Sequence, residues 1–453
     1  MSDLRDFLRQ AANVRPTQRQ RQWLDMGFYG FVHFGVNTFT GREWGTGRED
    51  PAIFNPTRLD CRQWVEVAKS AGMGGLILTA KHHDGFCLWP SKYTEHSVKH
   101  SPFRGGKGDV VREFADACRQ GGIKFGFYLS PWDRNSPLYG TEAYNDYYKA
   151  QLTELLTEYG DVFMVWFDGA CGEGPNGKKQ EYDFQGYIDL VRKYQPNACI
   201  FNDRGPDVRW IGNESGAARF AEWAVMPREL TSLAQVQTGP GPLYEEGALA
   251  HAYNTQPELG ALSNILPSGG LCFCPAETDM SIRPGWFWHE EEQPHSLERL
   301  LHTYITSVGG NSGLNLNLPP NREGRIDEKD ATRMAELGRA IERLFAREVP
   351  AQLTQTGPAH RPVYELDFGG EVSLGCLLLQ EEISQGQRVE SFLVDRLRPD
   401  GQWENVYQGT TIGNRRMALL KGKTQKLRLQ ITFARDAVNM KTIRLFEGES
   451  TWN

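Results

Sequence analysis

The sequence predicts a (β/α)8-type barrel followed by a C-terminal antiparallel β-sandwich. Strand-like and helix-like segments alternate through the first three quarters of the 453 residues, which is typical of a parallel sheet covered by helices. Several strand-like segments run directly into polar side chains. After Pro350 the pattern changes to short, alternating, β-rich runs separated by turns. We therefore expect a catalytic barrel domain over residues 1–348 and a sandwich domain over residues 349–453.

The barrel elements can be placed in order along the chain. The clearest helix boundaries are Asp109, which suits an N-cap, and Gly121-Gly122, which suits a helix stop. The predicted strands span residues 27–36, 74–80, 123–129, 161–167, 198–202 and 313–318. The predicted helices span residues 59–71, 109–118, 142–159, 185–194, 297–307 and 328–346. Gly and Pro accumulate between residues 205 and 270, as in 238–242, so long loops are expected there.

The C-terminal region contains five short runs that suit strands of a sandwich of about 100 residues. They span residues 371–379, 388–395, 404–407, 426–433 and 441–446. We expect this domain to serve packing and stability. A separate sugar-binding role is the alternative.

Composition narrows the class of partner. A net charge of −7 disfavours nucleic acid and anionic membranes and favours a neutral substrate. The first ten residues lack the apolar region of a signal peptide, and no stretch is long and apolar enough for a membrane span, so we expect a cytoplasmic protein. Its eight cysteines are then expected to be reduced, and the Cys272 and Cys274 spacing does not match a zinc site. The sequence does not give the oligomeric state.

Asp168 is the first candidate for chemistry. It follows the apolar run 162–167 and precedes Gly169. A carboxylate at the C-terminal end of a barrel strand faces the active-site end of the barrel. Because several predicted strands end in polar and aromatic groups, we expect a carbohydrate-cleaving barrel. Glycoside hydrolysis needs two carboxyl groups, so a second one must be found. Glu214, Glu222 and Glu277 all suit that role, and spacing alone does not choose among them.

Three histidines end two of the predicted strands: His33 follows the first, and His82 and His83 follow the second. They could bind zinc or donate hydrogen bonds to substrate hydroxyls. Adjacent side chains on an extended chain point to opposite faces, so both rarely bind one ion. We therefore favour hydroxyl recognition and predict no metal and no cofactor.

Taken together, these segments resemble a known family. The sequence is similar to the α-L-fucosidases of glycoside hydrolase family 29 over roughly residues 20–345. The matching blocks are His33-Phe34-Gly35, Glu43-Trp44-Gly45, Ala80-Lys81-His82-His83-Asp84-Gly85-Phe86, Gly126-Phe127-Tyr128-Leu129-Ser130 and Trp166-Phe167-Asp168-Gly169.

The resemblance implies a retaining double displacement that releases terminal α-L-fucose from oligosaccharides. It makes Asp168 the nucleophile. It also implies a set of residues that hold the fucose hydroxyls, steady the nucleophile or line the pocket near the fucose methyl group. These are His33, Glu43, Trp44, His82, His83, Tyr128 and Trp286, with Arg283 as a weaker candidate.

The acid/base also follows from the resemblance. The Gly212-Asn213-Glu214-x-Gly216 pattern, with Glu222 downstream, looks like the branch that prefers α-1,3- and α-1,4-linked, Lewis-type fucose. That likeness implies Glu214 as acid/base and Glu222 as second choice. The alternatives are a broad fucosidase acting on aryl or α-1,2-linked fucosides, another retaining glycosidase such as an α-galactosidase, a zinc hydrolase, and a non-catalytic carbohydrate-binding protein.

Overall fold

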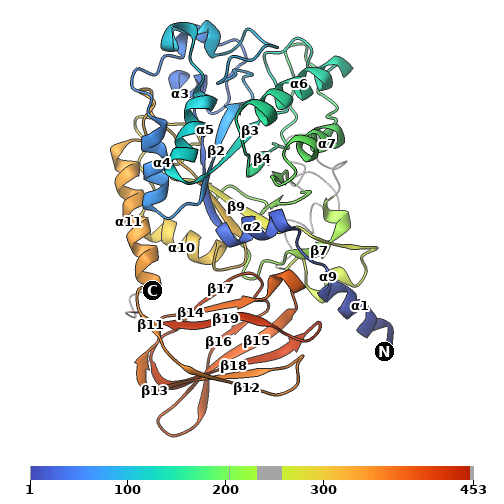
Figure 1. The fold of residues 1–453 in the computed structure, drawn as a ribbon, viewed down its shortest axis with the longest axis vertical. Helices are drawn as coiled ribbons and strands as arrows, with labels where there is room; N and C mark the ends of the chain where they lie inside the picture. Colours follow the sequence, from blue (N-terminus) through green and yellow to red (C-terminus); the bar gives the residue numbers. More distant parts are fainter. Residues whose placement is uncertain (1, 204, 232–257, 449–453) are drawn as a thin grey trace.

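Eight parallel strands form the first sheet, in the order β5-β4-β3-β2-β1-β10-β9-β6. The computed structural model describes residues 2–203, 205–231 and 258–448 (Figure 1). A parallel bridge from Phe201 to Val208 links the two edge strands, so the sheet is a nearly closed barrel. Its strands are β1 (Phe28–Val32), β2 (Gly75–Lys81), β3 (Lys124–Leu129), β4 (Met164–Trp166), β5 (Cys199–Phe201), β6 (Arg209–Trp210), β9 (Ala276–Ser281) and β10 (Gly313–Asn317). The predicted fold class is confirmed.

Helices cover the outside of the barrel, and six of them lie where the sequence predicts helices (Figure 1). Asp109 caps α5 by accepting a hydrogen bond from the Arg112 backbone, and Gly122 ends it with φ 72°. The helices are α1 (Ser2–Ala12), α2 (Gln18–Met26), α3 (Val36–Thr40), α4 (Cys61–Ser70), α5 (Val110–Gly121), α6 (Glu142–Glu158), α7 (Phe184–Tyr194), α9 (Leu262–Ile265), α10 (Leu297–Ser307) and α11 (Glu328–Leu344). Four of these helices, α1, α2, α3 and α9, were not predicted from the sequence.

Side chains alternate between the lumen and the outer face of the barrel. On β1, Tyr29 and Phe31 belong to the cluster inside the barrel, whereas Phe28 and Val32 pack under the helices. The same period of two places Met164 inside and Val165 outside on β4. Strand β9 was missed because Glu277 and Asp279 make it read as polar, and β6 was missed because it has only two residues.

The C-terminal domain consists of two antiparallel sheets that enclose a second core (Figure 1). One sheet is β11-β19-β14-β17 and the other is β12-β13-β18-β15-β16. Their bounds are β11 (Glu348–Val349), β12 (Gln352–Thr356), β13 (Val363–Ser373), β14 (Cys376–Glu381), β15 (Val389–Leu397), β16 (Trp403–Gly409), β17 (Arg416–Leu419), β18 (Lys423–Ala434) and β19 (Met440–Phe446).

The predicted single strand over 371–379 is wrong, because it joins the end of β13 to the start of β14. The strand is interrupted at Gly375, where an added Cβ would lie 2.5 Å from the Phe446 carbonyl oxygen. Glycine permits this close approach of two backbone segments. Strands β11, β12 and β17 were not predicted.

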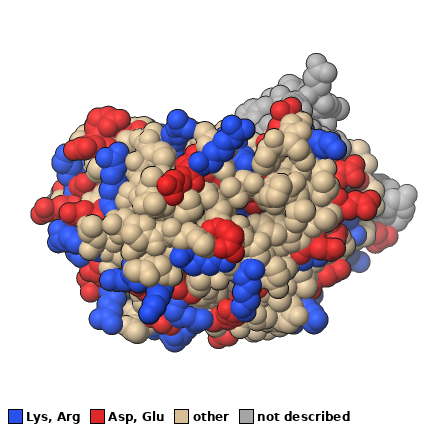
Figure 2. Space-filling model, turned by 90° about the horizontal axis from the view of Figure 1, so that it is seen from above, with Lys and Arg blue, Asp and Glu red and all other residues tan. Residues whose placement is uncertain are grey.

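The region predicted as long loops contains short elements as well. These are the antiparallel pair β7 (Val225–Pro227) and β8 (Leu271–Phe273), together with α9. The Gly/Pro segment 238–242 lies outside the described residues. Over the ranges given above, no helix combines the length and apolarity of a membrane span. Figure 2 shows one face of the molecule, on which positive and negative side chains are interspersed.

Candidate active site

Strand alternation explains which side chains meet at the C-terminal end of the barrel. The lumen positions of β1 continue from Tyr29 and Phe31 to His33, and those of β4 continue from Met164 and Trp166 to Asp168. On β3, the lumen residue Tyr128 precedes Ser130. A side chain two residues beyond a lumen position therefore reaches the open end of the barrel.

These side chains line a pocket of about 440 Å³. All nine predicted site residues contribute to it. The lining is Phe31, His33, Glu43, Trp44, His82, His83, Tyr128, Trp166, Asp168, Ala170, Asp203, Trp210, Glu214, Asp279 and Trp286. Aromatic rings form much of the wall, with charged and polar groups grouped among them, as expected of a sugar site.

Asp168 is held by donors on both carboxylate oxygens. The Tyr128 hydroxyl donates to Oδ2 at 2.8 Å, and the Ala170 backbone donates to Oδ1 at 2.8 Å. His83 Nε2 lies 3.8 Å from Oδ2. These contacts fix the position of the carboxylate at the open end of the barrel.

Hydrogen bonds to neighbours orient two of the histidine rings. The Asn317 Oδ1 atom accepts from the His33 backbone and lies 2.9 Å from His33 Nδ1, so Nδ1 carries the proton and Nε2 is an acceptor. Burial lowers the pKa of His33 to about 3, and the ring is neutral at physiological pH. Asn37 Nδ2 lies 3.4 Å from His82 Nδ1, which makes the Nε2 of His82 the donor.

The expectation that His82 and His83 point to opposite faces is wrong. Their ring centroids are 4.1 Å apart, and both rings line the pocket. The register between β2 and β3 shifts between Thr79 and Lys81, and the chain turns after His82, so the extended alternation ends there. His83 Nδ1 lies 2.7 Å from Ser130 Oγ.

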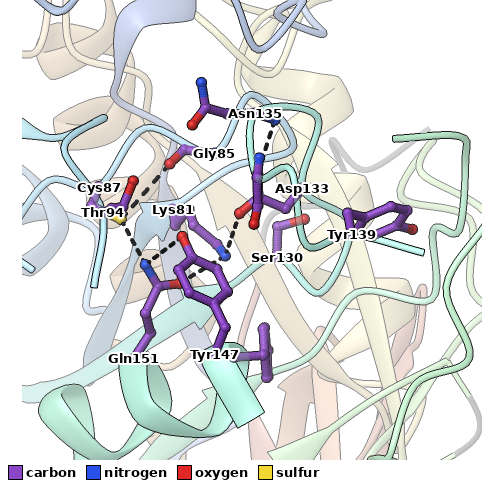
Figure 3. A network of polar contacts seen from close by, with 12 residues as sticks. Lys81, Gly85, Cys87, Thr94, Ser130, Asp133, Asn135, Tyr139, Tyr147 and Gln151 are labelled. Carbon is purple, nitrogen blue, oxygen red and sulfur yellow. Dashed lines mark hydrogen bonds and ion pairs between the residues drawn. The ribbon is translucent and has the colours of Figure 1, made fainter. Parts of the chain in front are cut away.

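The register shift turns Lys81 outward, into a buried polar network beneath the histidine turn (Figure 3). Its Nζ lies 3.1 Å from Asp133 Oδ2 and 2.9 Å from Gln151 Oε1. Asp133 Oδ1 accepts from the Asn135 and Ser136 backbones. The Lys81–Asp133 pair thus joins the end of β2 to the loop that follows β3.

Glu214 reaches the pocket from the loop after β6. Its Oε2 accepts from Trp286 Nε1 at 3.0 Å. Part of the side chain stays exposed, but burial of the rest raises the pKa of Glu214 above its ordinary value, and the charges of Asp168 and Glu43 add to this. The Trp286 hydrogen bond acts in the opposite direction. A carboxyl group with a raised pKa suits proton donation.

Glu43 is bound to the segment that carries Trp286. Its carboxylate accepts from the Trp286 backbone at 2.8 Å, the Phe287 backbone at 3.3 Å and His289 Nε2 at 2.8 Å. Trp44 is 54% exposed and meets the His83 ring edge to face at 5.8 Å. Trp44 therefore forms an open part of the pocket wall.

The sequence model of the Alpha-L-fucosidase family matches residues 14–343. The chain belongs to the α-L-fucosidase family. It is therefore a glycoside hydrolase of family 29, as the sequence resemblance predicted. "Alpha-L-fucosidase 1" of Arabidopsis thaliana is 42% identical over 433 residues, which cover 89% of this chain and 81% of the relative.

Two solved structures of this family match nearly the whole chain. One is a glycoside hydrolase 29 family member from an unknown rumen bacterium, with a TM-score of 0.84 and 39% identity over 97% of this chain and 78% of that chain. The other is a Ruminococcus gnavus GH29 fucosidase in complex with fucose, with a TM-score of 0.83 and 28% identity over 97% of this chain and 96% of that chain.

The structure of this fucosidase family member distinguishes Glu214 from the two other candidates for the acid/base, Glu222 and Glu277. Glu222 is fully buried and paired with Arg209 and Arg219, whose charges hold the pKa of Glu222 below its ordinary value against the effect of burial. An acid/base needs the opposite shift. Among the described residues, the pocket lining does not include Glu222.

Glu277 and Arg283 also lie outside the lining that the described residues form. Glu277 faces the barrel lumen, where its carboxyl group accepts from Trp166 Nε1 at 2.7 Å and from the Tyr29 hydroxyl. Arg283 is buried and bonded to Asp330 at 2.8 Å. Glu277 supports the Trp166 ring in the pocket wall, and Arg283 supports the segment after β9.

Several lining and supporting residues were not predicted from the sequence. Asp203 follows β5 as Asp168 follows β4, so the strand-end pattern could have identified it. Asn317 ends β10 and is fully buried, with its amide group bonded to His33, Ser281 and the Trp286 carbonyl. Its role depends on partners distant in sequence.

No cluster suited to a metal occurs among the described residues: no three His, Cys, Asp or Glu side chains are grouped to hold an ion. One ring nitrogen of His33 is hydrogen-bonded to the side chain of Asn317, and one ring nitrogen of His82 to that of Asn37. The remaining ring nitrogens suit hydrogen bonding to hydroxyl groups.

Proposed function

We propose that this enzyme is a retaining exo-α-L-fucosidase in which Asp168 is the nucleophile and Glu214 is the acid/base. The observation that carries the proposal is the contrast between two carboxyl groups in one pocket. Asp168 accepts hydrogen bonds on both oxygens, which hold its carboxylate in place for attack. Glu214 has a raised pKa, which favours its protonated form. A retaining glycosidase needs one group of each kind.

In the first step, Asp168 attacks the anomeric carbon while Glu214 gives its proton to the departing glycosidic oxygen. This forms a covalent fucosyl-enzyme ester and releases the rest of the glycan. In the second step, the Glu214 carboxylate takes a proton from water, and the water oxygen attacks the same carbon. Asp168 leaves as a carboxylate, and fucose is released with its original anomeric configuration.

The pocket chemistry suits fucose. The hydroxyl groups of the sugar can donate to His33 Nε2 and accept from His82 Nε2, because each ring has a fixed tautomer. The wall of Phe31, Trp166 and Trp286 offers an apolar surface to the C6 methyl group, where galactose would require a polar partner for O6. The Ruminococcus gnavus relative in complex with fucose supports the same sugar.

We further propose a preference for α-1,3- and α-1,4-linked, Lewis-type fucose, which rests on the Gly212–Gly216 sequence pattern around Glu214. Fucose release from 2'-fucosyllactose, 3-fucosyllactose, a Lewis-x trisaccharide and an aryl α-L-fucoside tests this preference. We expect release from the 3-linked and Lewis sugars. Release mainly from the 2-linked and aryl compounds would instead assign a broad fucosidase.

The roles of the carboxyl groups have a separate test. Asp168→Ala should abolish turnover on every substrate while the thermal unfolding midpoint stays close to wild type. Proton NMR of the first product formed by the wild type should show the α anomer of fucose. Retained turnover in Asp168→Ala, or an initial β anomer, would exclude the double displacement through Asp168.

A further inference from the structure

The Glu214 carboxyl group stands on a long connection that touches both domains. We call residues 211–224 the acid loop. Its first part is anchored to β9, because the Ile211 backbone donates to the Glu277 carbonyl at 2.9 Å and the Gly216 backbone donates to the Asp279 carbonyl at 3.1 Å. Arg219 then joins the two ends of the loop by donating to the Ile211 carbonyl at 3.2 Å and pairing with Glu222.

The last part of the acid loop packs on the C-terminal sandwich. Arg416 Nη1, from β17, donates to the Phe220 carbonyl at 2.7 Å, and its guanidinium group lies 5.4 Å from the centre of the Phe220 ring. Arg435 lies 3.9 Å from the centre of the Trp223 ring. Gln387 Oε1 accepts from the Ala224 backbone at 2.9 Å.

The sandwich side chains that hold the loop are themselves fixed. Arg416 is 3% exposed, and its other nitrogens donate to the Thr411 carbonyl at 3.1 and 2.9 Å. Gln387 is fully buried and donates to Thr411 Oγ1 at 2.7 Å. Both residues therefore present preformed groups to the loop, and forming these contacts costs little side-chain entropy.

A third connection runs through the barrel loop before β10. Asn311 Nδ2 donates to the Glu222 carbonyl at 2.8 Å, and Asn311 Oδ1 accepts from the Asn414 backbone at 2.7 Å. Gly310 forms a bridge with Arg416. The sandwich, directly or through Asn311, thus contacts Phe220, Glu222, Trp223 and Ala224 at the end of the acid loop. Arg219 connects this end to Ile211, at the start of the loop before Glu214.

We propose that the C-terminal sandwich positions the acid/base: Arg416 and Gln387 hold the acid loop so that Glu214 stays aimed at the glycosidic oxygen. Arg416 and Gln387 are then positioning residues, and the sandwich contributes to proton donation as well as to stability. This inference rests on the proposed role of Glu214.

The test separates proton donation from the rest of the reaction. α-L-Fucosyl fluoride has a leaving group that departs with little help from an acid, whereas the 3-fucosyllactose oxygen must be protonated. A positioned general acid contributes about 10²–10⁴-fold. Because kcat/KM reports only the steps up to the fucosyl-enzyme ester, Glu214→Gln should lose most of its kcat/KM on 3-fucosyllactose and far less of its kcat/KM on the fluoride.

Arg416→Ala should lose roughly tenfold in kcat/KM on 3-fucosyllactose, a part of the general-acid contribution, and stay within about twofold on the fluoride. Arg428→Ala is the matched control, because Arg428 also lies in the sandwich, pairs with Asp395 and covers the Trp403 ring at 4.4 Å. It should leave the ratio of the two activities unchanged. Thermal unfolding of each variant shows whether it is folded.

Gln387→Met removes the acceptor for the Ala224 backbone at similar volume and carries the test if Arg416→Ala does not fold. Equal losses on both substrates, or the same change of ratio in Arg428→Ala, would overturn the positioning role. If Glu214→Gln itself does not discriminate between the substrates, the assignment of Glu214 fails, and the inference fails with it.

Discussion

Replacing Lys81 by Met should destabilise the barrel by about 3–5 kcal/mol, the cost of leaving one partner of a buried ion pair alone. The Lys81 and Asp133 side chains are 0% and 1% exposed, and their charged atoms lie 3.1 Å apart (Figure 3). Methionine fills a similar volume but leaves the Asp133 carboxylate without a counter-charge. The backbones of Asn135 and Ser136 remain as its donors.

Thermal unfolding measures this loss. The unfolding entropy is about 2.1 cal/mol/K per residue, so a barrel of about 330 residues has an unfolding entropy of roughly 0.7 kcal/mol/K. Dividing a stability loss of about 4 kcal/mol by this entropy gives a decrease of about 6 °C in the unfolding midpoint. Lys92→Met is the matched control, because Lys92 is 70% exposed and pairs with Glu158 on the surface. An exposed pair contributes little to stability, so the control should move the midpoint far less than Lys81→Met does.

The double variant Lys81→Met/Asp133→Asn tests the cause. Asparagine keeps the oxygen that accepts from the two backbone amides but removes the buried charge, so the double variant should regain at least half of the lost midpoint. The reasoning is refuted if Lys81→Met unfolds within 2 °C of wild type, or if the double variant is no more stable than the single one.

Two further substitutions probe the pocket. Trp286→Phe removes a hydrogen bond that lowers the pKa of Glu214, so that pKa should rise, and the basic limb of the kcat/KM pH profile should move to higher pH. An unmoved limb, or a shift to lower pH, would contradict this role. Asn317→Ala leaves the buried His33 Nδ1–H without its acceptor. An unsatisfied buried donor costs about 1–3 kcal/mol, so the orientation of the His33 ring should be lost. The value of kcat/KM should then fall about tenfold or more. Unchanged kinetics would mean that His33 keeps its orientation without Asn317.

Much of the barrel and part of the site could be predicted because their signals are local. The Asp109 cap and the glycine stop of α5 lie within one segment, and both were found. The apolar run before Asp168 marked the strand end. Strand β9, with its charged lumen positions, was missed, because the barrel neighbours that satisfy Glu277, namely Tyr29 and Trp166, are remote in sequence.

The sequence by itself determined the fold class, the family resemblance and nine of the fifteen described residues that line the pocket, because strand ends and motif blocks are properties of short segments. Tertiary structure decided which glutamate could act as the acid. Glu214 and Glu222 are eight positions apart, but one meets Trp286 in the pocket and the other is enclosed by Arg209 and Arg219. Their opposite pKa shifts arise from those surroundings, which only the folded chain brings together.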